Sequence, residues 1–124
     1  MNDANAEKVS PFAGDMSAIE PDSRGEHIAT INELFRAVED IRELPNGYAF
    51  RLPNKPDVLL RTAKFIELER MCCPFFGFAV EVEPEGGAVW LSLTGRDGVK
   101  PFIVAEISDH LTKSTIRPGN FNLR

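Results

Sequence analysis

The stretch FAVEVEPEGGAVWLSL, from Phe78 to Leu93, contains two runs of alternating residues on either side of a turn. Val80 and Val82 alternate with Ala and Glu in the first run. Val89 and Leu91 alternate with Trp and Ser in the second run. Period-two alternation is typical of strands with one buried face, and Pro-Glu-Gly-Gly favours a turn between them. The stretch therefore predicts a β-hairpin.

An earlier part of the chain has the same kind of pattern. Residues 41–44 lead into Pro45-Asn46-Gly47, and residues 48–52 follow with Tyr, Phe and Leu at alternate positions. Proline presets φ, and Asn-Gly is expected to supply the left-handed backbone of a tight turn. This segment predicts another hairpin, which precedes the first one in the chain.

Helical patterns surround the two hairpins. Apolar residues recur every three or four positions in three segments, which are residues 23–37, 56–72 and 99–111. Ser23 and Glu26 match a capping box that would begin the first helix, and Asp97 is the expected N-cap of the third. Pro74 forces the second helix to stop near Cys72.

These elements predict an α+β fold in the order α-ββα-ββα. The simplest architecture is a four-stranded antiparallel sheet with helices packed on one face. We expect one domain over residues 23–112, a mobile N-terminal arm over residues 1–22 and a polar C-terminal tail over residues 113–124. Phe12 and Ile19 are the two residues of the arm that could dock on the domain.

Composition and charge exclude some classes of partner. The net charge is −5 and the basic residues are scattered among acidic ones, which disfavours nucleic acid. No apolar run has the length of a signal-peptide core or a membrane span, so we expect no membrane contact and a cytoplasmic location. The two cysteines are then expected to be thiols.

The adjacent cysteines Cys72 and Cys73 are the most distinctive chemical feature. Glu69 lies three and four residues before them, a spacing that places side chains on one helix face. On a helical wheel, Glu69 and Arg70 fall in the same stripe as Leu59, Thr62, Ala63, Ile66 and Cys73. We expect a pocket formed by Glu69, Arg70 and the two thiols, together with Phe75 and Phe76.

Three interpretations of the thiol pair remain open. Both thiols could be small buried hydrophobic groups of the core. They could bind a soft metal or metalloid ion, with Glu69, His27 or His110 supplying the further ligands. Thiol catalysis is disfavoured, because a helix C-terminus and a nearby carboxylate both raise a thiol pKa.

Two motifs around the thiol pair resemble a family of small bacterial proteins of uncharacterised activity. Residues 69–78 match ERxCCPFxxF and residues 91–102 match LxLTGxxGxxxF, while residues 44–48 fit the turn of the same family. The resemblance covers residues 23–112. It implies a shared fold but no substrate or reaction.

The sequence favours a non-enzymatic protein, and we assign no catalytic residue. The leading hypothesis is a thiol-based binder or sensor of soft metal or metalloid ions, with Cys72, Cys73 and Glu69 as ligands. The alternative is a homodimeric interaction module in which both cysteines are structural.

Overall fold

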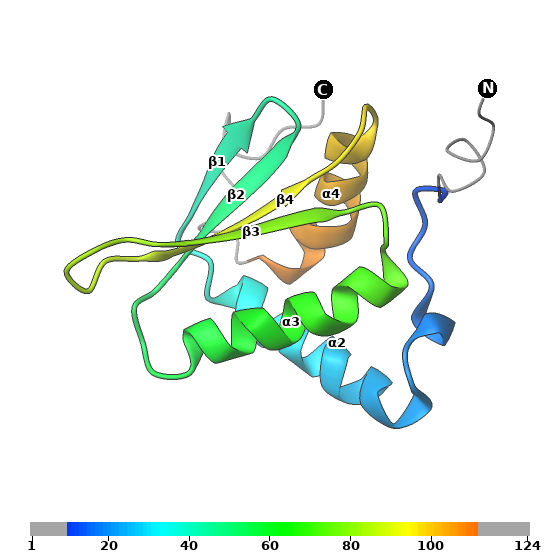
Figure 1. Ribbon diagram of the computed structural model, residues 1–124, viewed down its shortest axis with the longest axis horizontal. Helices are drawn as coiled ribbons and strands as arrows, with labels where there is room; N and C mark the ends of the chain where they lie inside the picture. Colours follow the sequence, from blue (N-terminus) through cyan, green and yellow to red (C-terminus); the bar gives the residue numbers. More distant parts are fainter. Residues whose placement is uncertain (1–9, 112–124) are drawn as a thin grey trace, which may run out of the picture.

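The computed structural model describes residues 10–111, so the predictions for residues 1–9 and for the C-terminal tail lie outside the described residues. The helices and strands are α2 (Pro21–Arg36), β1 (Asp40–Leu44), β2 (Gly47–Leu52), α3 (Val58–Cys72), β3 (Gly77–Val82), β4 (Val89–Thr94) and α4 (Val99–Ile107) (Figure 1). Two short 3-10 helices, η1 (Met16–Ala18) and η2 (Ser108–His110), flank them. This order confirms the predicted α+β fold.

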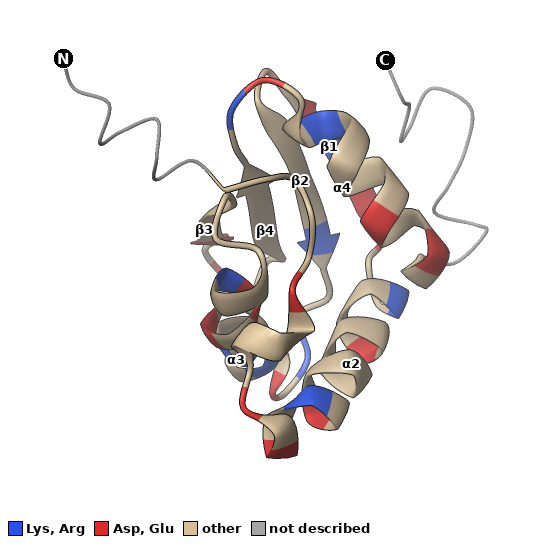
Figure 2. Ribbon diagram, turned by 90° about the vertical axis from the view of Figure 1, so that its right-hand side faces the viewer, with Lys and Arg blue, Asp and Glu red and all other residues tan. Residues whose placement is uncertain are grey.

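The four strands form one antiparallel sheet in the order β1-β2-β4-β3. Each hairpin contributes one central strand, and the two hairpins join where Phe50 pairs with Leu91. Figures 1 and 2 show α2, α3 and α4 on the same side of the sheet. The opposite face has a small cluster around Trp90, with the Arg42 guanidinium 4.1 Å from its ring centroid.

The core lies between this sheet and the helices, and phenylalanines occupy its centre. Phe35 packs edge-on against both Phe50 and Phe65, with ring centroids 5.3 and 5.4 Å apart. All three rings are fully buried. Edge-to-face contacts of this kind add about 0.5–1.5 kcal/mol each beyond the burial of apolar area. The long alternating runs of β2 and β4 thus face the helices, as their pattern indicated.

The segment before α2 packs against the domain. Ile19 is buried in the core, and the Phe12 ring contacts Phe75 and Phe102. The Arg96 guanidinium lies over the same Phe12 ring and donates a hydrogen bond to the Ser10 carbonyl. Phe12 and Ile19 therefore dock on the domain, and the described part of the predicted arm belongs to the folded structure.

All three helix starts differ from the sequence prediction, and α3 begins at Val58 rather than at residue 56. Helix α2 begins at Pro21 rather than Ser23, because proline is well suited to the first helical position. Its N-cap is Glu20, so the predicted capping box at Ser23 is wrong. The N-cap of α4 is Gly98 rather than Asp97, since the chain turns there with φ of 98°, where glycine has no steric penalty. None of the described helices combines the length and the apolar character needed to cross a membrane.

The first hairpin turn also forms differently from the prediction. Its two loop residues are Pro45 and Asn46, and Leu44 pairs with Gly47. Left-handed backbone occurs within residues 10–111 only at Asp57, Glu85, Gly86 and Gly98, so Asn46 and Gly47 do not supply it. Gly47 is instead required by close packing, because a Cβ there would lie 1.9 Å from the Leu93 backbone oxygen.

We expect Gly47→Ala to destabilise the fold, because the added Cβ forces β2 away from β4. The free energy of unfolding should fall by about 2 kcal/mol or more, as overpacking does in other cores. The control is Gly25→Ala in α2, where no atom lies within 4 Å of the added Cβ. That change should stabilise by about 0.5–1 kcal/mol. Urea denaturation measures both, and equal stabilities for the two variants would contradict the prediction.

Candidate metal centre

The buried face of α3 contains both glutamate and cysteine. Its buried residues are Val58, Thr62, Phe65, Glu69 and Cys72, spaced three or four positions apart. The predicted stripe through Leu59 and Ala63 is therefore wrong by about one position on the wheel, and Leu59 is 48% exposed. Glu69 points inward as predicted, whereas Arg70 is exposed.

Helix α2 brings a histidine to this face of α3. His27 is completely buried, and its Nε2 lies 2.8 Å from the Glu69 Oε1, to which it can donate. The imidazole also stacks on Phe65, with ring centroids 5.9 Å apart. The sequence offered His27 only as one of three possible further ligands. Its position one helical turn before buried Thr30 and two before buried Leu34 was the signal that it belongs to the core face.

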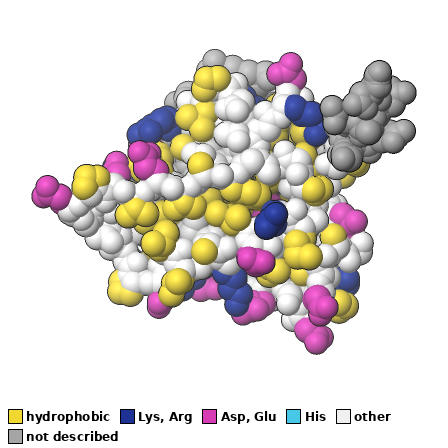
Figure 3. All heavy atoms as spheres, viewed as in Figure 1, with side chains coloured by type: hydrophobic (Ala, Val, Ile, Leu, Met, Phe, Trp, Pro, Cys, Tyr) yellow, Lys and Arg dark blue, Asp and Glu magenta, His cyan; other side chains and the backbone are white. Residues whose placement is uncertain are grey.

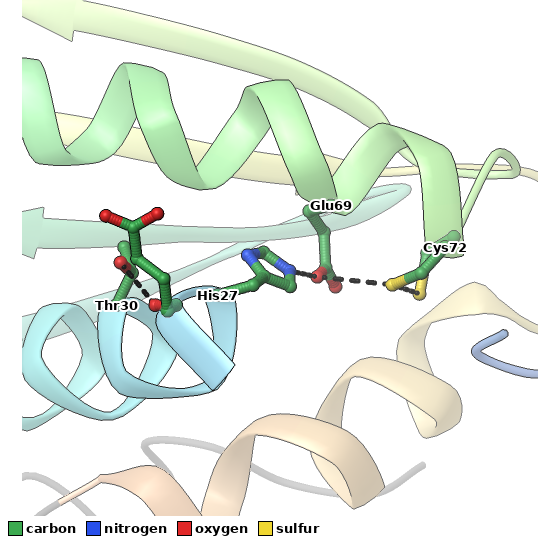
Figure 4. Close-up of polar contacts among 6 residues, drawn as sticks. His27, Thr30, Glu69 and Cys72 are labelled. Carbon is green, nitrogen blue, oxygen red and sulfur yellow. Dashed lines mark hydrogen bonds and ion pairs between the residues drawn. The ribbon is translucent and has the colours of Figure 1, made fainter. Parts of the chain in front are cut away.

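Four side chains form a row in the interior. Figure 4 shows His27, Glu69 and Cys72 side by side, with the Cys72 Sγ 3.5 Å from the Glu69 Oε1. The Cys73 Sγ lies 3.5 Å from the Cys72 Sγ and extends the row. The ligand atoms of His27, Glu69 and Cys72 all lie within 4.8 Å of one another. The structure therefore brings together three donor types that metal ions accept.

The electrostatics of the two thiols differ. The hydrogen bond from Cys73 lowers the pKa of the Cys72 thiol, burial opposes this effect and His27 adds to it. The contact with Cys72 and burial both raise the pKa of Cys73. Burial and Glu69 raise the pKa of both thiols, but at Cys72 the neighbouring thiol and His27 outweigh them, so the expectation that both thiols resist ionisation is wrong for Cys72.

His27 responds to the same charges. Burial alone would lower its pKa, but Cys72 and Glu69 favour the protonated ring and raise the pKa to about 9. Its Nδ1 is buried and has no hydrogen-bond partner within residues 10–111. A doubly protonated ring would leave one N–H unpaired there, at a cost of about 1–3 kcal/mol. The unpaired Nδ1 thus limits how strongly His27 holds a second proton.

The order of the row matters for its chemistry. In a nucleophilic triad the histidine stands between the nucleophile and the carboxylate, so that it can take the proton of the nucleophile. Here Glu69 stands between His27 and Cys72 and accepts from both. A carboxylate that faces both an imidazole and a thiol offers the mixed oxygen, nitrogen and sulfur donors of a ligand cluster.

A cavity of about 210 Å³ opens onto the row. Its walls are formed by Gly14, Met16, Ile31, Phe65, Glu69, Cys72, Cys73, Glu106, Ile107 and His110. Three of the predicted site residues, Glu69, Cys72 and Cys73, thus share one cavity. The second candidate histidine, His110, lines the wall but donates from Nδ1 to the Asn32 Oδ1 and stands outside the cluster.

Three predicted pocket residues lie elsewhere. Arg70 is on the exposed side of α3 and does not line the cavity. Phe75 and Phe76 pack against each other and against Phe102, with centroids 4.9 to 5.8 Å apart. They support the chain after Pro74 and do not touch the space in front of the thiols.

A larger hollow of about 310 Å³ lies at the start of α4, between the first turn and residues 95–101. It contains Arg96, Asp97 and Lys100 but no histidine or cysteine. The thiol cavity is smaller, yet it is the one that meets buried polar side chains.

No family model, no curated protein and no solved structure matches the chain significantly. The resemblance to a bacterial family through residues 69–78 and 91–102 therefore stays a prediction.

We expect a small alkylating reagent such as iodoacetamide to label Cys72 before Cys73 in the native protein. The thiolate reacts, and its fraction rises as the pH rises through the lowered pKa of Cys72. The midpoint, which is the pH at which the labelling rate is half its maximum, should therefore lie below the ordinary thiol pKa of about 8.5. Peptide mass mapping across pH measures both the site and the midpoint.

His27→Gln should raise that midpoint, because it removes the cationic neighbour of the thiolate. His110→Gln is the matched control and should leave the midpoint in place, since His110 bonds to Asn32 instead. Equal labelling of the two cysteines, or an ordinary midpoint in the unmodified protein, would contradict the assignment.

Proposed function

We propose that the protein binds a soft metal or metalloid ion through Cys72, with Cys73, Glu69 and His27 as further ligands. The observation that carries the proposal is the meeting of His27, Glu69 and Cys72 from two helices in one buried cluster. All three are less than one-tenth exposed. Buried groups of this kind are normally paired or coordinate an ion.

The donor set suits a soft ion. Thiolate and imidazole ligands favour zinc and copper(I), and by their softness also mercury and trivalent arsenic. With metal–ligand bonds of about 2.0–2.3 Å, the ligand atoms of a tetrahedral site lie roughly 3.3–3.8 Å apart. The Sγ atom of Cys72 lies 3.5 Å from the Cys73 Sγ and 3.5 Å from the Glu69 Oε1. Small side-chain shifts would therefore complete the site.

The position of the site favours a binder or sensor over a structural ion. The core is already packed with apolar side chains and needs no ion to hold it together. The thiols face a cavity. The backbone N–H of Asp15 donates to the Cys72 carbonyl, so a change at Cys72 reaches the N-terminal segment directly. Both cysteines are free thiols, which fits a reducing compartment, and we place the protein in the cytoplasm.

We expect metal-free protein to bind one equivalent of Cd²⁺, with the ultraviolet absorption of a thiolate complex. Cys72→Ser and His27→Gln should each weaken binding by at least the roughly 10–100-fold that loss of an outer-shell partner costs. Competition with a chelator, followed by absorbance and native mass spectrometry, measures the affinities.

His110→Gln and Arg70→Gln are the controls, because neither side chain belongs to the cluster. They should bind Cd²⁺ as the unmodified protein does. If all four variants bind Cd²⁺ as tightly as the unmodified protein does, or if the unmodified protein does not bind it, the cluster is part of the core and the proposal fails.

A second candidate function is a homodimeric interaction module, and one surface favours it. Val80 and Val82 are 39% and 55% exposed on β3, which is an edge strand. Leu59 on α3 is also exposed. Figure 3 shows hydrophobic side chains in a band across this face. An apolar edge strand is a site where a second chain can add, and the cysteines would then be structural.

In this alternative, Val82→Lys should convert a dimer into a monomer, because the charge would be buried between two edge strands. Light scattering after size-exclusion chromatography measures the change. Arg51→Lys on β2 is a surface control that keeps its charge. A monomeric unmodified protein would rule out the dimer without affecting the ion proposal.

A further inference from the structure

The cavity in front of the thiols is larger than an ion needs. Its volume is about 210 Å³, whereas one water molecule occupies about 30 Å³ of liquid. A bare ion bound to Cys72 and Cys73 would leave most of this space unfilled. The unfilled part has to hold either water or another group.

The walls away from the thiols are mainly apolar. They include Met16 from η1, Ile31 from α2, Phe65 from α3 and Ile107 from α4. Glu106 and His110 complete the walls, so only the part between the apolar side chains offers water few partners. A cavity of about 150 Å³ lined by Leu, Ile and Phe takes up benzene. The larger cavity here has room for a group of that size.

We propose that the ligand is a soft-element centre that carries one apolar organic group, with an organoarsenic(III) compound as the representative class. The centre binds Cys72 and Cys73, and the organic group fills the cavity between Met16, Ile31 and Ile107. The inference rests on the proposed function and adds the substrate class.

Two thiols 3.5 Å apart can chelate one such centre. In the reaction with R–As(OH)₂, two As–S bonds form, two As–O bonds break and the two thiol protons leave in two water molecules. Arsenic stays trivalent, so no oxidant or reductant is needed. Glu69 accepts a hydrogen bond from the Cys72 thiol, so it is positioned to take up that proton during the exchange.

The organic group also distinguishes this ligand from a bare ion. A centre with three exchangeable positions needs three protein donors or water. An R–As centre needs only two, which the adjacent thiols supply. The third bond then points to carbon, and the carbon group is buried against apolar walls.

The test compares phenylarsonous acid with methylarsonous acid in the intact, reduced protein. A Cβ on Gly14 would make only ordinary contacts, 3.7 Å from the Cys73 Sγ and from the Glu106 Oε1. Gly14→Leu should therefore fold and fill the cavity without removing a thiol. The matched control is Gly25→Leu, because an added Cβ there meets no atom within 4 Å. Competition with a small dithiol measures each affinity.

We expect the unmodified protein to bind the phenyl compound at least about tenfold more tightly than the methyl compound, relative to a Cys-Cys dipeptide. Gly14→Leu should weaken binding of the phenyl compound more than binding of the methyl compound, and so remove this preference. Gly25→Leu should change neither. If Gly14→Leu does not fold, Met16→Trp fills the same cavity and replaces it in the comparison.

An equal preference for phenyl in the unmodified protein, in Gly14→Leu and in the dipeptide would overturn the inference and leave ion binding intact. If neither arsenical nor Cd²⁺ binds the native protein, although both thiols react after denaturation, the proposed function fails as well. Cd²⁺ binding without any arsenical binding would overturn the inference alone.

Discussion

The hydrogen bond between His27 and Glu69 is the constraint on which the rest of the site depends. It joins α2 to α3 inside a core made largely of aliphatic and aromatic side chains. A carboxylate buried there is tolerable only if donors face it, and His27 and Cys72 are those donors. Loss of either partner would leave a buried polar group unpaired, so the two helices are held in one register by a polar contact rather than by shape alone.

The thiols are positioned as a consequence of this contact and of Pro74. With Glu69 directed inward, the next inward position one helical turn later is Cys72. Pro74 ends the helix there, and Cys73 leaves it with φ of −130° and ψ of 70°. One cysteine is therefore the last residue of the helix and the other is the first beyond it, yet both sulfurs meet at the same cavity.

The sequence predicted the strands well and the site only in part. Alternation through Val89 and Leu91 identifies a strand directly, because the period is two and the buried face is continuous. On α3 the apolar residues Leu59 and Ile66 suggested a false stripe, because the buried face there includes Glu69. The partnership of Glu69 with His27 joins residues far apart in the chain, and no local pattern encodes it. The sequence therefore named the thiols and included His27 among the possible ligands, but it did not predict the contact between His27 and Glu69.

The pairing of β2 with β4 has a consequence for how the chain folds. These central strands come from different hairpins, with all of α3 between them in the sequence. The four-stranded sheet cannot form until both hairpins have met, so it gains little stability before this long-range contact forms. We expect folding to be a single cooperative step limited by that closure. Partly synthesised chains that end before β4 would then leave one edge of β2 unpaired.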